Sequence, residues 1–352
     1  MSLAVRRGFF GGLIAAGFAA LFAFSVWVAD RPDVTLDLSL PWAISEFHTQ
    51  NAYRFAEAVR AATDGRVVIT VHPGAALGIK GPDSLRAVSD GIVPMVEMAG
   101  FQQTGSEPIL GLEALPFLID DHAELAQLYT IIRPAVEAAF ERHGVKVLYI
   151  VPWPNQNLFS NRVTPTLEDL SGLKVRTLDA NTTDLMEASG LVAVQMPSPD
   201  VLPSLASGAI DATLTSTTTA VAQKYWDFLT YTVRTNHNWA CNMMVINQSA
   251  WEKLSVADRA IIEQIARDLE PEFWAVSERD DKAMLARLEA EGMTTHALPD
   301  AWRGPFLEDS RALWAAYVTR VPDARPLLEA YLAKTGRLPL APATSGTGEG
   351  GQ

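Results

Sequence analysis

"SGLKVRTLDANTTD" (171–184) places an arginine inside a segment that otherwise has the pattern of a buried β-strand running into a helix. Leu173 and Val175 alternate with Lys174 and Arg176, which is the two-residue period of a strand. After this strand, Asn181 has the residue type of a helix N-cap, with Asp184 at the third position. The segment therefore predicts a strand–loop–helix unit with a cation in the strand.

A guanidinium in such a strand needs a partner, because a buried charge is unfavourable unless it is paired. Two carboxylates nearby in the sequence, Asp179 and Asp211, would provide an internal ion pair. The other interpretation is that Arg176 is left for an anion that arrives from outside.

The rest of the chain repeats this alternation of strands and helices, which favours an α/β fold with parallel-type sheets in both halves. Strands are predicted at 34–40, 66–72, 92–98, 145–151, 158–163, 173–178, 192–195 and 209–215. Helices are predicted at 50–63, 82–91, 120–143, 182–189, 200–207, 256–291, 305–319 and 323–334. We expect Pro134 and Pro271 to kink or interrupt the two longest helices, since proline removes a backbone donor.

Composition excludes several classes of protein. The 352 residues suit about two domains, and the net charge of −13 argues against nucleic acid as a partner, since phosphate contacts need a positive surface. Cys241 is the only cysteine, so neither an intramolecular disulfide nor a cysteine-based metal site can form. The six histidines lack metal-ligand spacing. We expect no cofactor and no metal.

Both ends of the chain have a composition of their own. "MSLAVRR" is a short basic start, and residues 8–29 form an apolar run of 22 residues. This pattern favours a secretory signal peptide over residues 1–29, with an uncleaved membrane anchor as the alternative. Both would send the body of the protein across the membrane, and we expect it in the periplasm. The Pro-, Gly-, Ser- and Thr-rich residues 336–352 predict a disordered tail.

Enzyme motifs such as GxSxG, a Walker A loop and HExxH do not occur in this sequence. Instead, aromatic, amide and hydroxyl residues follow the ends of several predicted strands, where open α/β sheets bind ligands. A packing or helix-capping role for each residue is the alternative, and their occurrence together favours a binding cleft. These residues are Trp42, Trp153, Gln156, Asn157, Thr215, Ser216 and Trp239.

The order of several short motifs resembles the DctP-type solute-binding proteins of TRAP (tripartite ATP-independent periplasmic) transporters. The motifs are "LPFL" (115–118), "GLKVRT" (172–177), "GAIDA" (208–212), "QKYWDF" (223–228), "TNH" (235–237) and the long helix at 256–291. The resemblance covers about residues 34–335. It implies two α/β lobes joined by crossing strands and braced by one long helix. Lobe I would comprise 34–152 plus about 241–270, and lobe II 153–240 plus about 271–335.

The resemblance also implies a site, in which Arg176 grips the carboxylate of a small organic acid through a bidentate pair. Where sialic-acid-type members carry a second arginine, this sequence offers Gln156, and Thr215 stands where they have an asparagine. Both departures argue against sialic acid and for a monocarboxylate. Glu97 is a further candidate that would accept a hydroxyl or ammonium group, although a structural carboxylate is an equally good interpretation.

The predicted function is therefore a non-enzymatic receptor that passes an organic acid, aromatic or branched if the tryptophans line the site, to a small and a large membrane permease subunit. Two alternatives stay open: a secreted enzyme on a similar scaffold, and a sensory protein that signals through a membrane receptor.

Overall fold

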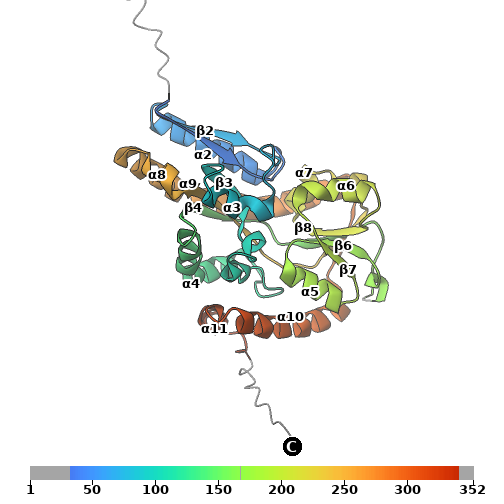
Figure 1. The fold of residues 1–352 in the computed structure, drawn as a ribbon. Coiled ribbons are helices and arrows are strands. Elements are labelled where there is room, and N and C mark those ends of the chain that lie inside the picture. The colour runs from blue at the N-terminus through green and yellow to red at the C-terminus, as the bar shows by residue number, and fades with distance from the viewer. Residues whose placement is uncertain (1–31, 167, 341–352) are drawn as a thin grey trace, which may run out of the picture.

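The computed structural model describes residues 32–166 and 168–340, which form two mixed α/β lobes, each built on its own sheet (Figure 1). The first lobe has the strand order β2 (Val67–His72), β1 (Val34–Ser39), β3 (Met95–Ala99), β10 (Cys241–Asn247), β4 (Val145–Pro152). The second lobe has the order β11 (Thr294–Ala297), β9 (Tyr231–Arg234), β5 (Asn157–Ser160), β8 (Ala212–Thr215), β6 (Lys174–Thr177), β7 (Val192–Gln195).

Two chain segments cross between the lobes, residues 153–156 after β4 and residues 235–240 before β10. They lie side by side, since the Trp153 N–H donates to the Ala240 carbonyl at 2.8 Å and the Gln156 N–H donates to the Asn238 carbonyl at 3.0 Å. This paired crossing is the connection about which the lobes can move as bodies.

The expectation of parallel-type sheets is wrong for the strands next to the crossing. β10 runs antiparallel to both β3 and β4, and β5 runs antiparallel to both β8 and β9. The other pairs, such as β1 with β2 and β6 with β8, are parallel as predicted. The reason is topological. In the first lobe, β4 runs toward the crossing and β10 runs away from it, so the two neighbours are antiparallel. In the second lobe, β9 runs toward the crossing and β5 runs away from it.

Helices cover the two sheets and connect them. The first lobe carries α2 (Phe47–Ala62), α3 (Ser84–Ser89), α4 (His122–Glu141) and α8 (Gln248–Glu252), and the second carries α5 (Ala180–Ala188), α6 (Val201–Ala206) and α7 (Thr217–Ala222). The long helix α9 (Val256–Ala290) contacts α2 and β4 in the first lobe and α7 in the second, so it braces both. At the bottom of Figure 1, α10 (Asp300–Arg320) contacts α5 and α11 (Ala324–Lys334) contacts α4.

Neither proline breaks its helix. α4 continues through Pro134 and α9 continues through Pro271, against the expected interruption of the first. A proline removes one backbone donor, and packing along the whole helix outweighs that local loss. Next to Pro271, the Glu270 carboxylate accepts the Ile150 N–H at 3.1 Å and pairs with Arg133, which holds this part of α9 against the first lobe.

The helix after the opening motif starts two residues earlier than predicted. Its N-cap is Asp179, which has extended backbone (φ −148°) and accepts the Thr182 N–H at 2.7 Å, and not Asn181. Because Asn181 lies inside α5, its amide is free to reach the other lobe, where it donates to the Gly111 carbonyl at 3.3 Å.

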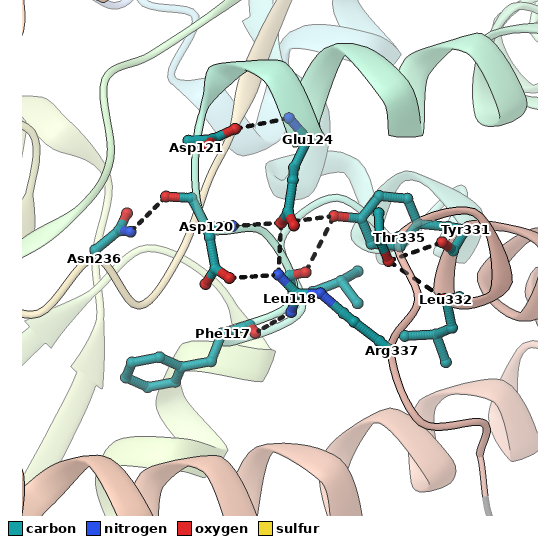
Figure 2. Close-up of polar contacts among 10 residues, drawn as sticks. All are labelled: Phe117, Leu118, Asp120, Asp121, Glu124, Asn236, Tyr331, Leu332, Thr335 and Arg337. Carbon is teal, nitrogen blue, oxygen red and sulfur yellow. Dashed lines mark hydrogen bonds and ion pairs between the residues drawn. The ribbon is translucent and has the colours of Figure 1, made fainter.

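A cluster of polar contacts attaches the end of the described chain to the first lobe (Figure 2). The Arg337 guanidinium pairs with Asp120 at 2.8 Å and with Glu124 at 2.5 Å, and also donates to the Phe117 carbonyl at 3.2 Å. Asn236, in the second crossing, donates to the Asp120 carbonyl at 2.8 Å. The loop before α4 is thus held from two sides.

The predicted signal segment (1–29) and most of the predicted tail (341–352) lie outside the described residues. Among residues 32–166 and 168–340, no helix combines the length and the apolar character needed to cross a bilayer.

Candidate ligand-binding site

Arg176 lies on β6, which is paired on one side with β8 and on the other with β7. Only 4% of the residue is exposed. Its Nε donates to the Met196 carbonyl at 2.9 Å and its Nη1 donates to the Leu214 carbonyl at 3.0 Å. These two bonds orient the guanidinium, and Nη2 has no acceptor among the described residues.

Neither candidate for an internal ion pair reaches Arg176. The Asp179 carboxylate caps α5, and the Asp211 carboxylate accepts the Lys174 N–H at 3.3 Å. In the part of the chain that the structure describes, no carboxylate lies within ion-pair distance of this guanidinium. Burial lowers the pKa of Arg176, while Tyr225 and Asp179 act in the opposite direction. An arginine keeps its charge in proteins, so the site holds a partly desolvated cation that an anion would stabilise.

The guanidinium borders a cavity of about 30 Å³ between the lobes. A buried water needs roughly 10 to 15 Å³, so the lobes are nearly closed and the cavity suits only a small guest. The first lobe contributes Trp42, Phe101 and Gln102, and the crossing segments contribute Trp153, Gln156 and Ala240. The second lobe contributes Arg176, Leu178, Ser198, Thr215, Ser216, Thr219 and Tyr225.

The Trp153 ring forms the cavity wall at the crossing between the lobes. A series of buried hydrogen bonds fixes this ring in place. Its Nε1 donates to Asn242 Oδ1 at 2.8 Å, and Asn242 Nδ2 donates to Glu97 Oε1 at 3.0 Å. Glu97 also lies 2.8 Å from His48 Nδ1. The Trp42 ring packs edge to face against the Trp153 ring, with centroids 5.0 Å apart, so each indole restricts the orientation of the other.

Hydroxyl groups form the wall next to Arg176. Thr215 ends β8, and Ser216 caps α7 by accepting the Thr219 N–H at 3.2 Å. Ser216 Oγ also lies 2.8 Å from Thr218 Oγ1. Tyr225 belongs to the same lining, and burial raises the pKa of its phenol above the ordinary value, so the group stays neutral. Its O–H donates to Gln223 Oε1 at 3.3 Å. Hydroxyl groups can both donate and accept, which suits the polar substituents of an organic acid.

Across residues 32–166 and 168–340, no group of three or more His, Cys, Asp or Glu residues is arranged to hold a metal ion. Cys241 is buried, and burial raises the pKa of its thiol well above the usual value, which makes it a poor nucleophile. The chemistry that the cavity supports is therefore recognition of a small anion by a fixed cation, polar groups and aromatic walls.

Comparison with known protein families identifies the family of this chain. Residues 40–320 match the DctP family, bacterial extracellular solute-binding proteins of family 7. The chain belongs to the DctP family of TRAP solute-binding proteins. Members of this family are extracytoplasmic solute receptors of transporters, and the family is not an enzyme family.

Three relatives illustrate the range of this DctP family. The Bordetella pertussis receptor DctP7, which binds pyroglutamic acid, is 25% identical, with a TM-score of 0.82 over 85% of this chain and 99% of that one. A marine metagenome TRAP protein specific for pyroglutamate is 26% identical, with a TM-score of 0.81 over 86% of this chain and 99% of that one. The sialic acid-binding protein SiaP of Vibrio cholerae is 20% identical over 86% of this chain and 94% of its own length.

Six of the nine residues predicted for the ligand site line this cavity. Those that line it are Trp42, Trp153, Gln156, Arg176, Thr215 and Ser216. Three others lie outside the lining. Glu97 belongs to the buried chain behind Trp153, and Trp239 packs in the core of the first lobe with its ring against His122. Asn157 is buried in β5, where its Nδ2 donates to the Asn155 carbonyl at 3.2 Å.

Seven further lining residues were missed in the sequence. Phe101 and Gln102 follow the strand 92–98, so the rule that led to Trp42 and Trp153 also applies to them. Tyr225 lies in "QKYWDF", a motif used only for the resemblance, and Thr219 ends the hydroxyl run 215–219. Ser198 follows the strand 192–195 in the same way, whereas Leu178 and Ala240 carry no such signal.

Proposed function

We propose that this protein captures a small organic monocarboxylate between its lobes, with Arg176 as the anchor for the carboxylate. The observation that carries the proposal is a buried guanidinium at a cavity, fixed by two carbonyls and without a carboxylate partner among the described residues. Arg176 is the only charged residue among those that line the cavity, which favours a ligand with a single negative charge.

The two pyroglutamate-binding relatives support a compact acid of this kind, and pyroglutamate is the first probe to test. The proposal extends to the periplasm as the location, reached through the N-terminal apolar segment, and to a small and a large permease subunit as the recipients of the ligand.

The test is to measure binding by titration calorimetry, after a thermal-shift screen of organic acids with pyroglutamate included. A ligand at 100 times its dissociation constant adds about 2.7 kcal/mol of stability, which such a screen detects. We expect Arg176→Met and Arg176→Lys to weaken binding at least about 100-fold, because lysine keeps the charge but loses the fork that matches two carboxylate oxygens.

The matched control is Arg86→Ala, which removes an arginine whose side chain is 86% exposed on α3, and which should leave the affinity unchanged. Thermal unfolding without ligand shows whether each variant is folded. A folded Arg176 variant that binds the acid within twofold of the wild type would show that Arg176 is not the anchor.

A further inference from the structure

Glu46 carries a carboxyl group that is shut away from water where the two lobes meet. The residue belongs to the first lobe, directly before α2, and is 1% exposed. Its Oε2 is buried and has no hydrogen-bond partner among the described residues. The neighbouring Ser45 Oγ donates to the Ala222 carbonyl of α7 at 3.3 Å, so this part of the first lobe lies directly against the second lobe.

Groups of the second lobe cover the Glu46 carboxyl. It interacts with the Thr219 hydroxyl of α7 and acts on the phenol of Tyr225, and both of these residues line the ligand cavity. They belong to the lobe that moves away when the cleft opens, and water then reaches the carboxyl. The exposure of Glu46 to water is therefore set by the closing of the lobes.

The surroundings of Glu46 offer nothing to balance a negative charge. It forms no ion pair in the part of the chain that the structure describes, and its side chain accepts no bond from the first turn of α2. Tyr225 faces it as a neutral phenol, with Arg176 acting on that phenol. In α2, burial lowers the pKa of His48, and this imidazole lies 2.8 Å from the Glu97 carboxylate instead.

A carboxylate that is buried without a cation is unfavourable, so the group keeps a proton. Burial accordingly raises the pKa of Glu46 to about 8, and the Thr219 hydrogen bond lowers it only in part. In the open arrangement the same carboxyl is surrounded by water and ionises at neutral pH.

We infer that capture of the ligand is linked to the uptake of one proton by Glu46, because closing of the lobes converts a solvated carboxylate into a buried carboxylic acid. The proton comes from the solvent on closing and returns to it on opening. The inference rests on the proposed function for the ligand, although the linkage itself belongs to lobe closure and requires no contact between Glu46 and the ligand.

The linkage has a definite sign. A group whose pKa is higher in the closed form favours closing at the pH values where it is protonated, so the affinity should be highest near pH 5 and fall as pH rises toward 8. The open form titrates near the ordinary value of 4.5 and the closed form near 8. Between these values the affinity should fall by up to about tenfold per pH unit.

Titration calorimetry with pyroglutamate tests the linkage, and the acid with the largest thermal shift in the screen is used if pyroglutamate does not bind. At pH 6.5, in two buffers whose heats of ionisation differ, the wild type should take up about one proton for each ligand bound. From pH 5.5 to pH 7.5, the affinity should fall by up to about 100-fold.

Glu46→Gln is neutral at every pH and should remove this dependence. We expect it to bind like the wild type at pH 5.5, to take up about one proton fewer at pH 6.5, and to bind more tightly than the wild type at pH 7.5. A purely structural role for Glu46 would weaken binding at every pH instead. Glu46→Met, also neutral and of similar volume, replaces the glutamine variant if that variant does not fold.

The matched control is Glu57→Gln, which changes a side chain on α2 that is 63% exposed and should leave the proton uptake of the wild type unchanged. Burial also raises the pKa of Asp179 and of Glu113. These two groups are present in every variant, so the difference from the wild type isolates Glu46.

The outcomes separate this inference from the proposed function. If the wild type and the neutral variants take up the same number of protons, or if their affinities fall equally with pH, Glu46 is not the linked group and the Arg176 anchor stands. If no acid in the screen binds the wild type, the proposed function fails, and the linkage fails with it.

Discussion

At the scale of single residues, Glu46 is a carboxyl group enclosed between the lobes. It precedes α2 in the first lobe, is 1% exposed, and interacts with the hydroxyl of Thr219 across the cleft. Its Oε2 has no partner and no cation pairs with it among the described residues. Burial therefore raises the pKa of Glu46 to about 8, and the Thr219 hydrogen bond opposes this only in part.

This environment makes stability depend on pH through Glu46. The folded protein keeps the proton up to about pH 8, whereas the unfolded chain releases it above an ordinary value near 4.5. The contribution of the Glu46 proton to the unfolding free energy is complete below pH 4.5 and is lost as pH rises toward 8, at up to about 1.4 kcal/mol per pH unit. We expect Glu46→Gln, which is neutral at every pH, to flatten the decline of the unfolding free energy between pH 5 and 8.

Urea unfolding of both proteins across this range measures the slopes. Burial also raises the pKa of Glu113 to about 7 and that of Asp179 to about 6, and these groups contribute a decline of the same sign. Since they are present in both proteins, the difference between the slopes isolates Glu46. Equal slopes would show that Glu46 is ionised in the folded protein.

At the scale of elements, the contacts of Figure 2 predict how much the segment after α11 contributes to stability. Arg337 is 18% exposed and bonds two carboxylates and one carbonyl of the segment 117–124, which runs into the first turn of α4. Removing it leaves Glu124 with the Asp120 N–H and the Tyr331 hydroxyl as its remaining partners. We expect Arg337→Ala to lower the unfolding free energy by about 2 kcal/mol, measured by urea unfolding.

The control for Arg337 is Arg325→Ala on α11. Within residues 32–166 and 168–340, Arg325 pairs only with Glu329, at 3.3 Å and one helical turn away, and such pairs contribute roughly 0.3 to 0.5 kcal/mol. Similar losses in the two variants would mean that the segment after α11 adds little to the stability of the first lobe.

At the scale of the whole molecule, the closed arrangement places an ion pair across the cleft. Lys80 of the first lobe lies 2.8 Å from Asp200 of the second, and both side chains are nearly half exposed. Close by, Ser45 Oγ donates to the Ala222 carbonyl at 3.3 Å, again between the lobes. These contacts can form only when the lobes are together, so they favour the closed form.

We expect Lys80→Ala to increase the dissociation rate of a bound acid by about two- to fivefold, since an exposed pair contributes roughly 0.2 to 1 kcal/mol. The double variant Lys80→Asp, Asp200→Lys should restore the wild-type rate. Added salt should reduce the difference in rate between the wild type and Lys80→Ala. Stopped-flow fluorescence measures the rates. The control is Asp90→Ala, which removes the partner of Arg86 at the C-terminal end of α3. If the dissociation rate is the same in Lys80→Ala as in the wild type, this ion pair does not stabilise the closed form.

Local sequence patterns determined most of the elements. Apolar periodicity predicted α9 to within one residue and placed the strand of Arg176. Both predictions succeeded because the repeat of apolar residues is a property of neighbouring positions in the sequence. The short strands β9 and β11 were not predicted, since four residues carry too little pattern. The N-cap at Asp179 was missed because aspartate and asparagine, two residues apart, fit the same capping role.

The sequence alone determined the two-lobed α/β class, through the order of its motifs, and the residue types at the ends of the strands. Only the tertiary structure decided which of those residues share a cavity. The structure places Gln102 in the lining of the cavity and places Trp239 and Glu97 behind it, although the sequence puts all three near strand ends. The direction of a side chain near a strand end depends on sheet order and on the pairing of the two crossings. These are contacts between residues far apart in the chain, and local pattern does not encode them.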